Sequence, residues 1–502
     1  MIYTNTQGAK AIKNRTAVYA FAAATAFFFN TYLILVYGSE IPFWDEWDAQ
    51  AANLLIPLLR GQLHFADVLA NHNEHRIFFG RVIWLLSYSL SGYWDVKLIM
   101  VLNSLIHGAF VLMLINTLSG EMDQRRFCLV ATLVVLISCL PMGWENILWG
   151  MQSVVYALLL FALLANFVLS KSKPLTLRWL FGTFIAICSY FCMASGALTL
   201  VPYIIFSIYM LLRTKDWKYV GSILIHSAIT GVLLMSIPKL NYSVLKPAQD
   251  VYTAYNSFVL LVSWPLPPHF ISAVLLNMPF VIFTIRAVRA RSVSPSDWAG
   301  ILWTLWVYLH IAAFAYGRGE TTGMTSRYAD IVIQSTIANA AFLVALNYRR
   351  RSRSIISLAT VASAVWAGVV AVFLLMQVQP SVSGLEWRRG ASALQDANLH
   401  RYLTTGDPTV LAGLPHAAIP YPSDQRLIGL INDATLQKIL PPRINPKNTE
   451  ATVILAPMSG FHLIIDYLKN FILKASPYIA LLSGLGVLVL TGLSMRNTGR
   501  LS

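Results

Sequence analysis

Residues 16–37, TAVYAFAAATAFFFNTYLILVY, form the apolar run that decides the fold class of this chain. A helix that crosses a hydrocarbon layer of roughly 30 Å needs about 20 mostly apolar residues, and this run has 22. It exceeds the apolar core of a cleaved signal and continues into Gly38-Ser39-Glu40 without a small-residue cleavage site. We therefore expect a retained first membrane helix.

The whole chain shares this apolar character. Of its 502 residues, 57% are apolar and only 12% are charged, and the mean hydropathy is +0.61, values outside the range of soluble globular proteins. Twelve runs are long enough to cross a membrane, which predicts an all-α polytopic membrane protein. The predicted spans are 16–37, 97–118, 127–142, 147–169, 178–194, 196–212, 219–237, 270–288, 298–316, 329–347, 355–377 and 476–495.

The net charge of +15 follows the predicted topology. With the N-terminus inside, the cytoplasmic segments hold 20 of the 37 basic and 4 of the 22 acidic residues, which leaves 17 basic and 18 acidic residues outside. Positive residues concentrate on the cytoplasmic side of membrane proteins. The charge therefore needs no nucleic-acid partner, and both termini are expected to be cytoplasmic.

Two ambiguous segments affect this topology. Residues 77–90 are apolar for 14 positions around Arg81, which is short for a span and suits a helix along the interface. Residues 178–212 are split at Ser195-Gly196 into two tightly joined helices, because a single crossing would turn the later basic loops outward.

Three regions follow from this assignment. Residues 1–377 form the transmembrane domain, and 378–475 form a small outer region rich in turn residues that is expected to pack on the membrane domain. Its tail, 461–474, has the pattern of an interfacial helix. Residues 476–502 supply the last span and a cytoplasmic tail.

The first outer loop, 38–96, opens with EIPFWDEWDAQ at 40–50. A helical pattern over 44–59 places Asp45 and Asp48 on one face of a short surface helix, with Glu46 adjacent. Such acids can simply complement a helix dipole. At the bilayer boundary, however, a lipid-borne substrate would present its headgroup to them.

A second surface helix is predicted over 75–90, introduced by NHNEHRIFFGR at 71–81. Glu74 and Arg81 are seven residues apart, so they can form an ion-pair row along the helix. Alternatively, His75 or Arg76 can hold a phosphate or a sugar. Both interpretations fit the spacing.

This layout resembles the GT-C superfamily of integral-membrane glycosyltransferases. At residue level the chain is similar to bacterial glucosyltransferases that modify O-antigen, the serotype-conversion type. The segments that carry the likeness are PFWDEWD (42–48), NEHRIFFGR (73–81), ENILWGMQSVVY (145–156) and GRGETTGMTSRY (317–328).

The resemblance implies an inverting transfer of a hexose from a polyprenyl-phosphate carrier to an O-antigen or other lipid-linked glycan. It places the reaction at the periplasmic face of the bacterial inner membrane. A loop acid at the start of the first surface helix serves as general base in such enzymes, and Asp45 matches that position. A paired-acid pattern fits either Asp45 with Glu46 or Asp45 with Asp48.

The departing phosphate gains negative charge, so it requires cations or hydrogen-bond donors. YGRGETTGMTSRYAD, 316–330, offers Arg318 and Arg327 for a phosphate, together with hydroxyl donors. The purely structural alternative is a hairpin whose arginines extend to the membrane interface. The hydroxyl donors are Thr321, Thr322, Thr325 and Ser326, of which Ser326 can also cap the span at 329–347.

Other groups are secondary. Arg388 and Arg389 can anchor the chain at the interface, and Glu145 is an outer acid in a suggestive context. Asp45, Glu46 and Asp48 could bind a divalent cation, but we expect no metal and no other cofactor. A transporter of lipid-linked sugars or an O-antigen polymerase or ligase are the competing functions.

Overall fold

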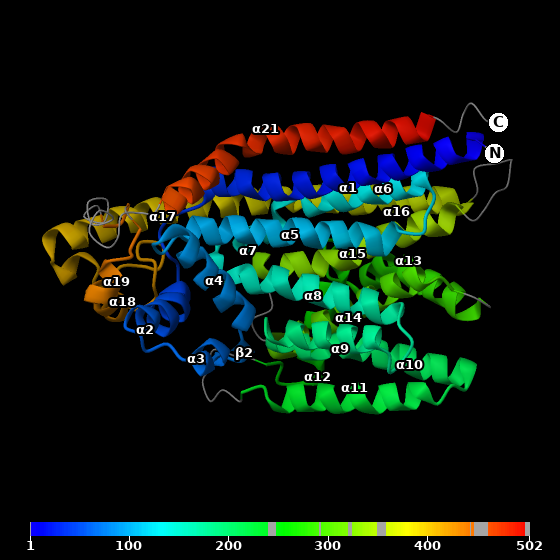
Figure 1. The fold of residues 1–502 in the computed structure, drawn as a ribbon, viewed down its shortest axis with the longest axis horizontal. Coiled ribbons are helices and arrows are strands. Elements are labelled where there is room, and N and C mark those ends of the chain that lie inside the picture. Colours follow the sequence, from blue (N-terminus) through cyan, green and yellow to red (C-terminus); the bar gives the residue numbers. More distant parts are fainter. Residues whose placement is uncertain are drawn as a thin grey trace.

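Helices make up most of the residues that the structure describes, and the one sheet among them is a two-stranded hairpin (Figure 1). The computed structural model describes residues 2–238, 247–290, 293–319, 324–348, 358–441, 443–445 and 460–496. Long helices lie side by side along the longest axis, and α1 (Ile2–Tyr37) begins at the end of the bundle where α21 (Gly460–Arg496) ends. The loop after α1 lies at the opposite end, beside α17 (Val378–Thr405).

Eleven helices in the described part of the chain are long and apolar enough to cross a membrane. The protein is therefore a multi-pass membrane protein. Six of these segments are Asn14–Tyr37 in α1, α5 (Val96–Ser119), α11 (Lys218–Met235), α13 (Phe270–Arg289), α14 (Pro295–Gly317) and α21. A seventh, Ser326–Asn347, lies in α15 (Ser326–Tyr348).

The other four long segments join shorter elements. The component elements are α6 (Gln124–Ser138), η2 (Pro141–Gly143) and α7 (Trp144–Leu148); η3 (Gly150–Gln152) and α8 (Ser153–Ser170); η4 (Ala194–Leu200) and α10 (Val201–Thr214); and α16 (Leu358–Met376) with α17. Together the eleven segments correspond to eleven of the twelve predicted spans.

Two further apolar helices in the described part of the chain are shorter than a membrane span. The predicted span at 178–194 is α9 (Leu177–Tyr190), which has 14 residues. The helix α12 (Val251–Ser263) was not predicted, because its 13 residues include Thr253, Asn256 and Ser257 and are too few to suggest a crossing.

The break between α9 and α10 has a clear steric cause. The chain folds back so closely that a Cβ added at Gly196 would lie 2.2 Å from the carbonyl oxygen of Ser189. The Ser189 hydroxyl donates to the Gly196 carbonyl oxygen at 3.1 Å. The prediction of two helices over 178–212 is confirmed, but the break lies at 191–193 instead of Ser195-Gly196, which belong to η4.

The last helix packs on the first (Figure 1). Small residues of α21 allow the approach, since a Cβ on Gly486 would lie 2.8 Å from the Phe21 ring. The Thr25 hydroxyl donates to that of Ser483 at 3.0 Å. The predicted interfacial helix at 461–474 is wrong as a separate element, because α21 runs without interruption from Gly460 to Arg496.

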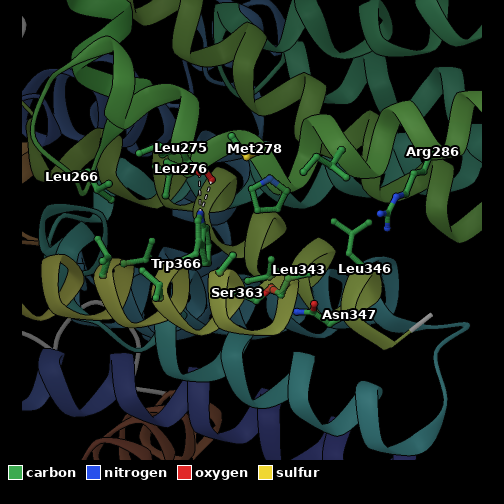
Figure 2. Close-up of a pocket in the computed structure, with 17 residues that line it drawn as sticks. Leu266, Leu275, Leu276, Met278, Arg286, Leu343, Leu346, Asn347, Ser363 and Trp366 are labelled. Atoms are coloured by element: carbon green, nitrogen blue, oxygen red, sulfur yellow. Dashed lines mark hydrogen bonds between the residues drawn. The ribbon is translucent and has the colours of Figure 1, made fainter. Parts of the chain in front are cut away.

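A proline shapes α13 and an apolar cavity beside it. Pro279 has no N–H to donate to the carbonyl of Leu275 one turn earlier. Figure 2 shows Trp366 of α16 pointing at this carbonyl, to which its indole N–H donates at 3.1 Å. The cavity, which we call the apolar cavity, has a volume of about 450 Å³ and lies between α13, α15 and α16.

The loop after α1, residues 38–96, differs in detail from its prediction. The predicted helix 44–59 is a π-helix, η1 (Trp47–Leu55), followed by α2 (Ile56–Leu59). The predicted helix 75–90 begins later, as α4 (Phe78–Ser91), because His75 and Arg76 form strand β2 (His75–Arg76) of a hairpin.

The remaining described elements are short. They are α3 (Phe65–Leu69) and β1 (Asn71–His72) in this loop, and η6 (Pro408–Val410), α18 (Asp424–Ile431) and α19 (Ala434–Gln437) in the C-terminal region.

Candidate functional site

One pocket gathers residues from the loop after α1, from the end of α14 and from the start of α15. We call it the polar pocket; its volume is about 130 Å³. Five of the eight predicted site residues line it, and they come from segments more than 240 positions apart in the sequence. These five are Asp45, Glu74, His75, Arg318 and Arg327, and other lining residues include His72, Trp149, Gln152 and Tyr328.

Asp45 is the one of the three acids at 45–48 that lines the polar pocket. Its side chain is 42% exposed, and its Oδ2 lies 3.7 Å from Nε2 of His72. Trp44, just before it, has a positive φ of 50°, a left-handed conformation that is uncommon for a bulky residue. This turn comes before η1, where a regular α-helix was predicted to start. It orients the Asp45 side chain toward the β1–β2 hairpin.

Glu46 is buried away from the pocket. Its Oε2 accepts a hydrogen bond from the Phe43 N–H at 2.6 Å, and Arg388 interacts with it electrostatically. Burial raises the pKa of Glu46 to about 7 even though these two neighbours lower it. Glu46 therefore holds the turn together and does not reach the polar pocket.

Asp48 connects the loop to the C-terminal region, through Tyr421 and Arg426. It accepts hydrogen bonds from the Tyr421 hydroxyl and from Nη2 of Arg426, the latter at 2.9 Å. Burial, together with the Asp48 carboxylate, raises the pKa of the Tyr421 hydroxyl to about 12. Asp45 and Asp48 thus have different partners, and only Asp45 lines the pocket.

Glu74 is the centre of an ion-pair cluster. Its Oε1 lies 2.9 Å from Nη2 of Arg318 and 3.4 Å from Nε2 of His75. The Ala194 N–H donates to Nδ1 of His75 at 3.3 Å. Burial lowers the pKa of His75, and the Arg318 charge adds to this effect while Glu74 opposes it.

The predicted ion pair between Glu74 and Arg81 is wrong, since the chain between them forms a strand and a turn and not a continuous helix. Arg81 is buried and donates to the carbonyls of Val68 and Ala70. Arg76 donates to the Leu69 carbonyl at 3.2 Å and does not line the polar pocket. Both arginines support the hairpin.

Arg327 lies at the start of α15. Its Nε is 3.8 Å from Oε1 of Glu145, and its guanidinium lies over the Trp149 ring, 5.8 Å from the ring centre. The Ser326 hydroxyl donates to the same Glu145 carboxylate. The predicted donors Thr321 and Thr322 lie outside the described residues.

Below this arginine, a buried carboxylate fixes the first turns of α15. Oδ2 of Asp330 accepts hydrogen bonds from Nδ2 of Asn146 at 2.9 Å and from the Tyr156 hydroxyl at 2.8 Å. Asn146 also donates to the Arg327 carbonyl at 3.1 Å. This network positions Arg327 and was not predicted, because its members come from three separate helices.

Metal ligation has no obvious place among the residues that the structure describes. No group of three or more His, Cys, Asp or Glu side chains there could hold a metal ion. Asp45, Glu46 and Asp48, predicted as an alternative oxygen-ligand set, instead face His72, the Phe43 backbone and Arg426.

Comparisons of this chain with family models, with curated proteins and with solved structures find no match. The chemistry of the polar pocket is therefore derived from its residues. It combines the accessible Asp45 carboxylate, the imidazoles of His72 and His75, and two arginines, each paired with an acid.

Proposed function

We propose that this chain is an inverting glycosyltransferase that moves a sugar from a polyprenyl-phosphate carrier to an acceptor glycan at the outer membrane face. The observation that supports this proposal most is that Asp45 shares one pocket with Arg318 and Arg327. The GT-C-like order of motifs agrees with it. In bacteria, such a reaction would take place on the periplasmic side of the inner membrane.

Asp45 acts as the general base in this proposal. The acceptor hydroxyl attacks the anomeric carbon, and its proton moves to the Asp45 carboxylate. The bond between the anomeric carbon and the phosphate oxygen breaks, and its electron pair leaves with the polyprenyl phosphate. Among the residues that the structure describes, the Asp45 carboxylate has an ion-pair contact with His72 at 3.7 Å, and 42% of its side chain is exposed, so it is available for this step.

Arg318 and Arg327 receive the developing phosphate charge. Each guanidinium has five N–H donors, and a carboxylate orients each one: Glu74 lies beside Arg318 and Glu145 beside Arg327. The N-terminus of α15, which begins at Ser326, adds its positive dipole end. Fixed donors of this kind favour the transition state because they need no reorganisation when charge develops.

Loss of one sugar from the surface polysaccharide tests the proposal. We would delete the gene in its native host, compare the polysaccharide by mass spectrometry, and restore the gene on a plasmid. Glycosyl transfer predicts that the repeat unit loses one hexose mass and regains it on complementation. A change in chain length alone would indicate a polymerase, and retained lipid-linked sugar on the inner face would indicate a transporter.

A further inference from the structure

A second cavity adjoins the polar pocket and is lined by tryptophans. We call it the tryptophan cavity; its volume is about 120 Å³. Trp149 and Arg327 line both hollows, so the two share a wall. The four tryptophans are Trp44 from the first outer loop, Trp144 and Trp149 from the α7 segment, and Trp387 from α17.

The aromatic rings of this cavity are held in place. The Trp149 indole N–H donates to the Phe43 carbonyl at 3.0 Å, and the two rings pack edge to face at 5.7 Å. A Cβ added at Gly384 of α17 would lie 2.5 Å from Nε1 of Trp144, so the glycine lets this ring pack on the helix. Preformed ring surfaces of this kind bind a ligand without first being ordered.

Trp44 is fixed by its backbone. Its positive φ of 50° is costly for an aromatic residue, and its N–H donates to the Pro420 carbonyl at 2.7 Å. Its ring lies 5.9 Å from that of His416. The outer C-terminal region therefore holds the backbone that presents Trp44 to the cavity.

Charged groups stand between these rings, and each has an opposite charge nearby. Arg327 lies near Glu145, and Arg388, only 3% exposed, lies over the Phe43 ring at 4.0 Å and interacts with Glu46. Aromatic faces beside polar groups suit a ligand that has hydroxyl groups at its edge and apolar C–H groups on its face, and a pyranose ring has both.

We propose that the tryptophan cavity is the acceptor subsite, where a neutral pyranose of the glycan lies against the tryptophan rings with its hydroxyls bonded to Glu145 and the arginines. The inference rests on the proposed function. It identifies the acceptor side, since an acceptor hydroxyl must reach Asp45 and this cavity shares a wall with the pocket that Asp45 lines.

Binding of simple sugars to the purified full-length protein tests the subsite without any catalysis. The probes are methyl glycosides of glucose, galactose, mannose, rhamnose and N-acetylglucosamine, observed by saturation-transfer NMR. The test variant is Trp387→Ala, whose side chain is 53% exposed and lies in α17. The matched control is Trp217→Ala, an exposed tryptophan that lines neither hollow.

We expect at least one glycoside to bind with a millimolar Kd. Trp387→Ala should weaken it about 3- to 10-fold, the size of one aromatic contact, Trp387→Phe should restore most of the affinity, and Trp217→Ala should have no effect. Binding of no glycoside, or equal binding by Trp387→Ala, would overturn the proposal.

Kinetics separate this inference from the proposed function. Trp387→Ala should raise the KM for the acceptor and leave the KM for the donor unchanged. If Trp387→Ala left the KM for the acceptor unchanged while Asp45→Asn lost transfer, only the subsite would be rejected. Glycoside binding that depends on Trp387, with normal transfer in Asp45→Asn, would instead keep a sugar site and reject Asp45 as the base.

Discussion

Helix α15 borders both the polar pocket and the apolar cavity of Figure 2, and its two ends differ in chemistry. Arg327 and Tyr328, in its first turn, line the polar pocket, whereas Leu343 and Leu346, near its other end, line the apolar cavity. The described lining of the apolar cavity includes no carboxylate and no imidazole. The volume of the apolar cavity is more than three times that of the polar pocket, yet its described lining offers no carboxylate or imidazole to accept a proton.

The comparison shows that volume alone does not identify a reaction site. In the apolar cavity the Trp366 N–H is already bonded to carbonyls of α13. In the polar pocket the ion pairs orient Arg318 and Arg327, and Asp45 keeps an exposed carboxylate. Chemistry is therefore expected where charged groups are positioned and accessible, a difference that substitutions in the two regions can test.

The largest effect is expected at Asp45. Asp45→Asn should reduce sugar transfer in cells by about 10² to 10⁴-fold, the usual contribution of a general base. Asp48→Asn is the matched control, because Asp48 pairs with Arg426 outside the pocket. The readout is the hexose content of the polysaccharide, measured by mass spectrometry at equal protein levels. Equal loss in both variants would mean that the carboxylates act as one structural unit.

A similar contrast applies to two arginines. Arg318→Ala should lower the transfer rate of the purified enzyme about 10² to 10³-fold, as loss of a charge-stabilising donor does. Arg286→Ala, in the lining of the apolar cavity, should keep the rate. If Arg286→Ala lost as much activity as Arg318→Ala, the two regions would not differ in function.

Glu46 links the site to stability. Because burial raises its folded-state pKa from 4.5 to about 7, its carboxylate costs the folded protein stability as pH rises through this interval. Glu46→Gln should remove this cost and so stabilise the protein by about 3 kcal/mol above pH 7, with little change near pH 4.5. Thermal unfolding of both proteins in detergent across this pH range measures it. Parallel curves would show that Glu46 titrates normally.

The smallest effect is expected in the apolar cavity. Trp366→Phe removes the N–H that bonds the α13 carbonyls left by Pro279, so the protein should lose about 1 kcal/mol of stability. Transfer activity should not change. Thermal unfolding and the transfer rate, measured on one preparation, check both parts. Reduced transfer at wild-type stability would assign the apolar cavity a role in the reaction.

Much of the fold could be predicted because apolar runs of membrane length have few alternatives. The helix α12 was missed since its polar residues shorten the apolar run. The hairpin was also missed, and with it His72, which pairs with His75 across β1 and β2. Helical spacing carries no sign of such a cross-strand pair.

The residue types of the candidate site could be predicted, but the contacts between those residues could not. The motifs drew attention to Glu74 and Arg318, yet the ion pair between them joins positions 244 residues apart. Likewise, neither local spacing nor composition indicates that Glu145 pairs with Arg327, or that Asp48 binds the C-terminal region. Such contacts depend on how the helices pack, which local patterns do not encode.

Donor binding and transfer, measured together in purified Asp45→Asn, test the central claim most directly. The protein would be mixed with radiolabelled polyprenyl-phosphate glucose and with acceptor lipid extracted from the deletion strain. A base at Asp45 predicts that the variant binds the donor as the wild type does and forms almost no product. Product formation at the wild-type rate would contradict the claim.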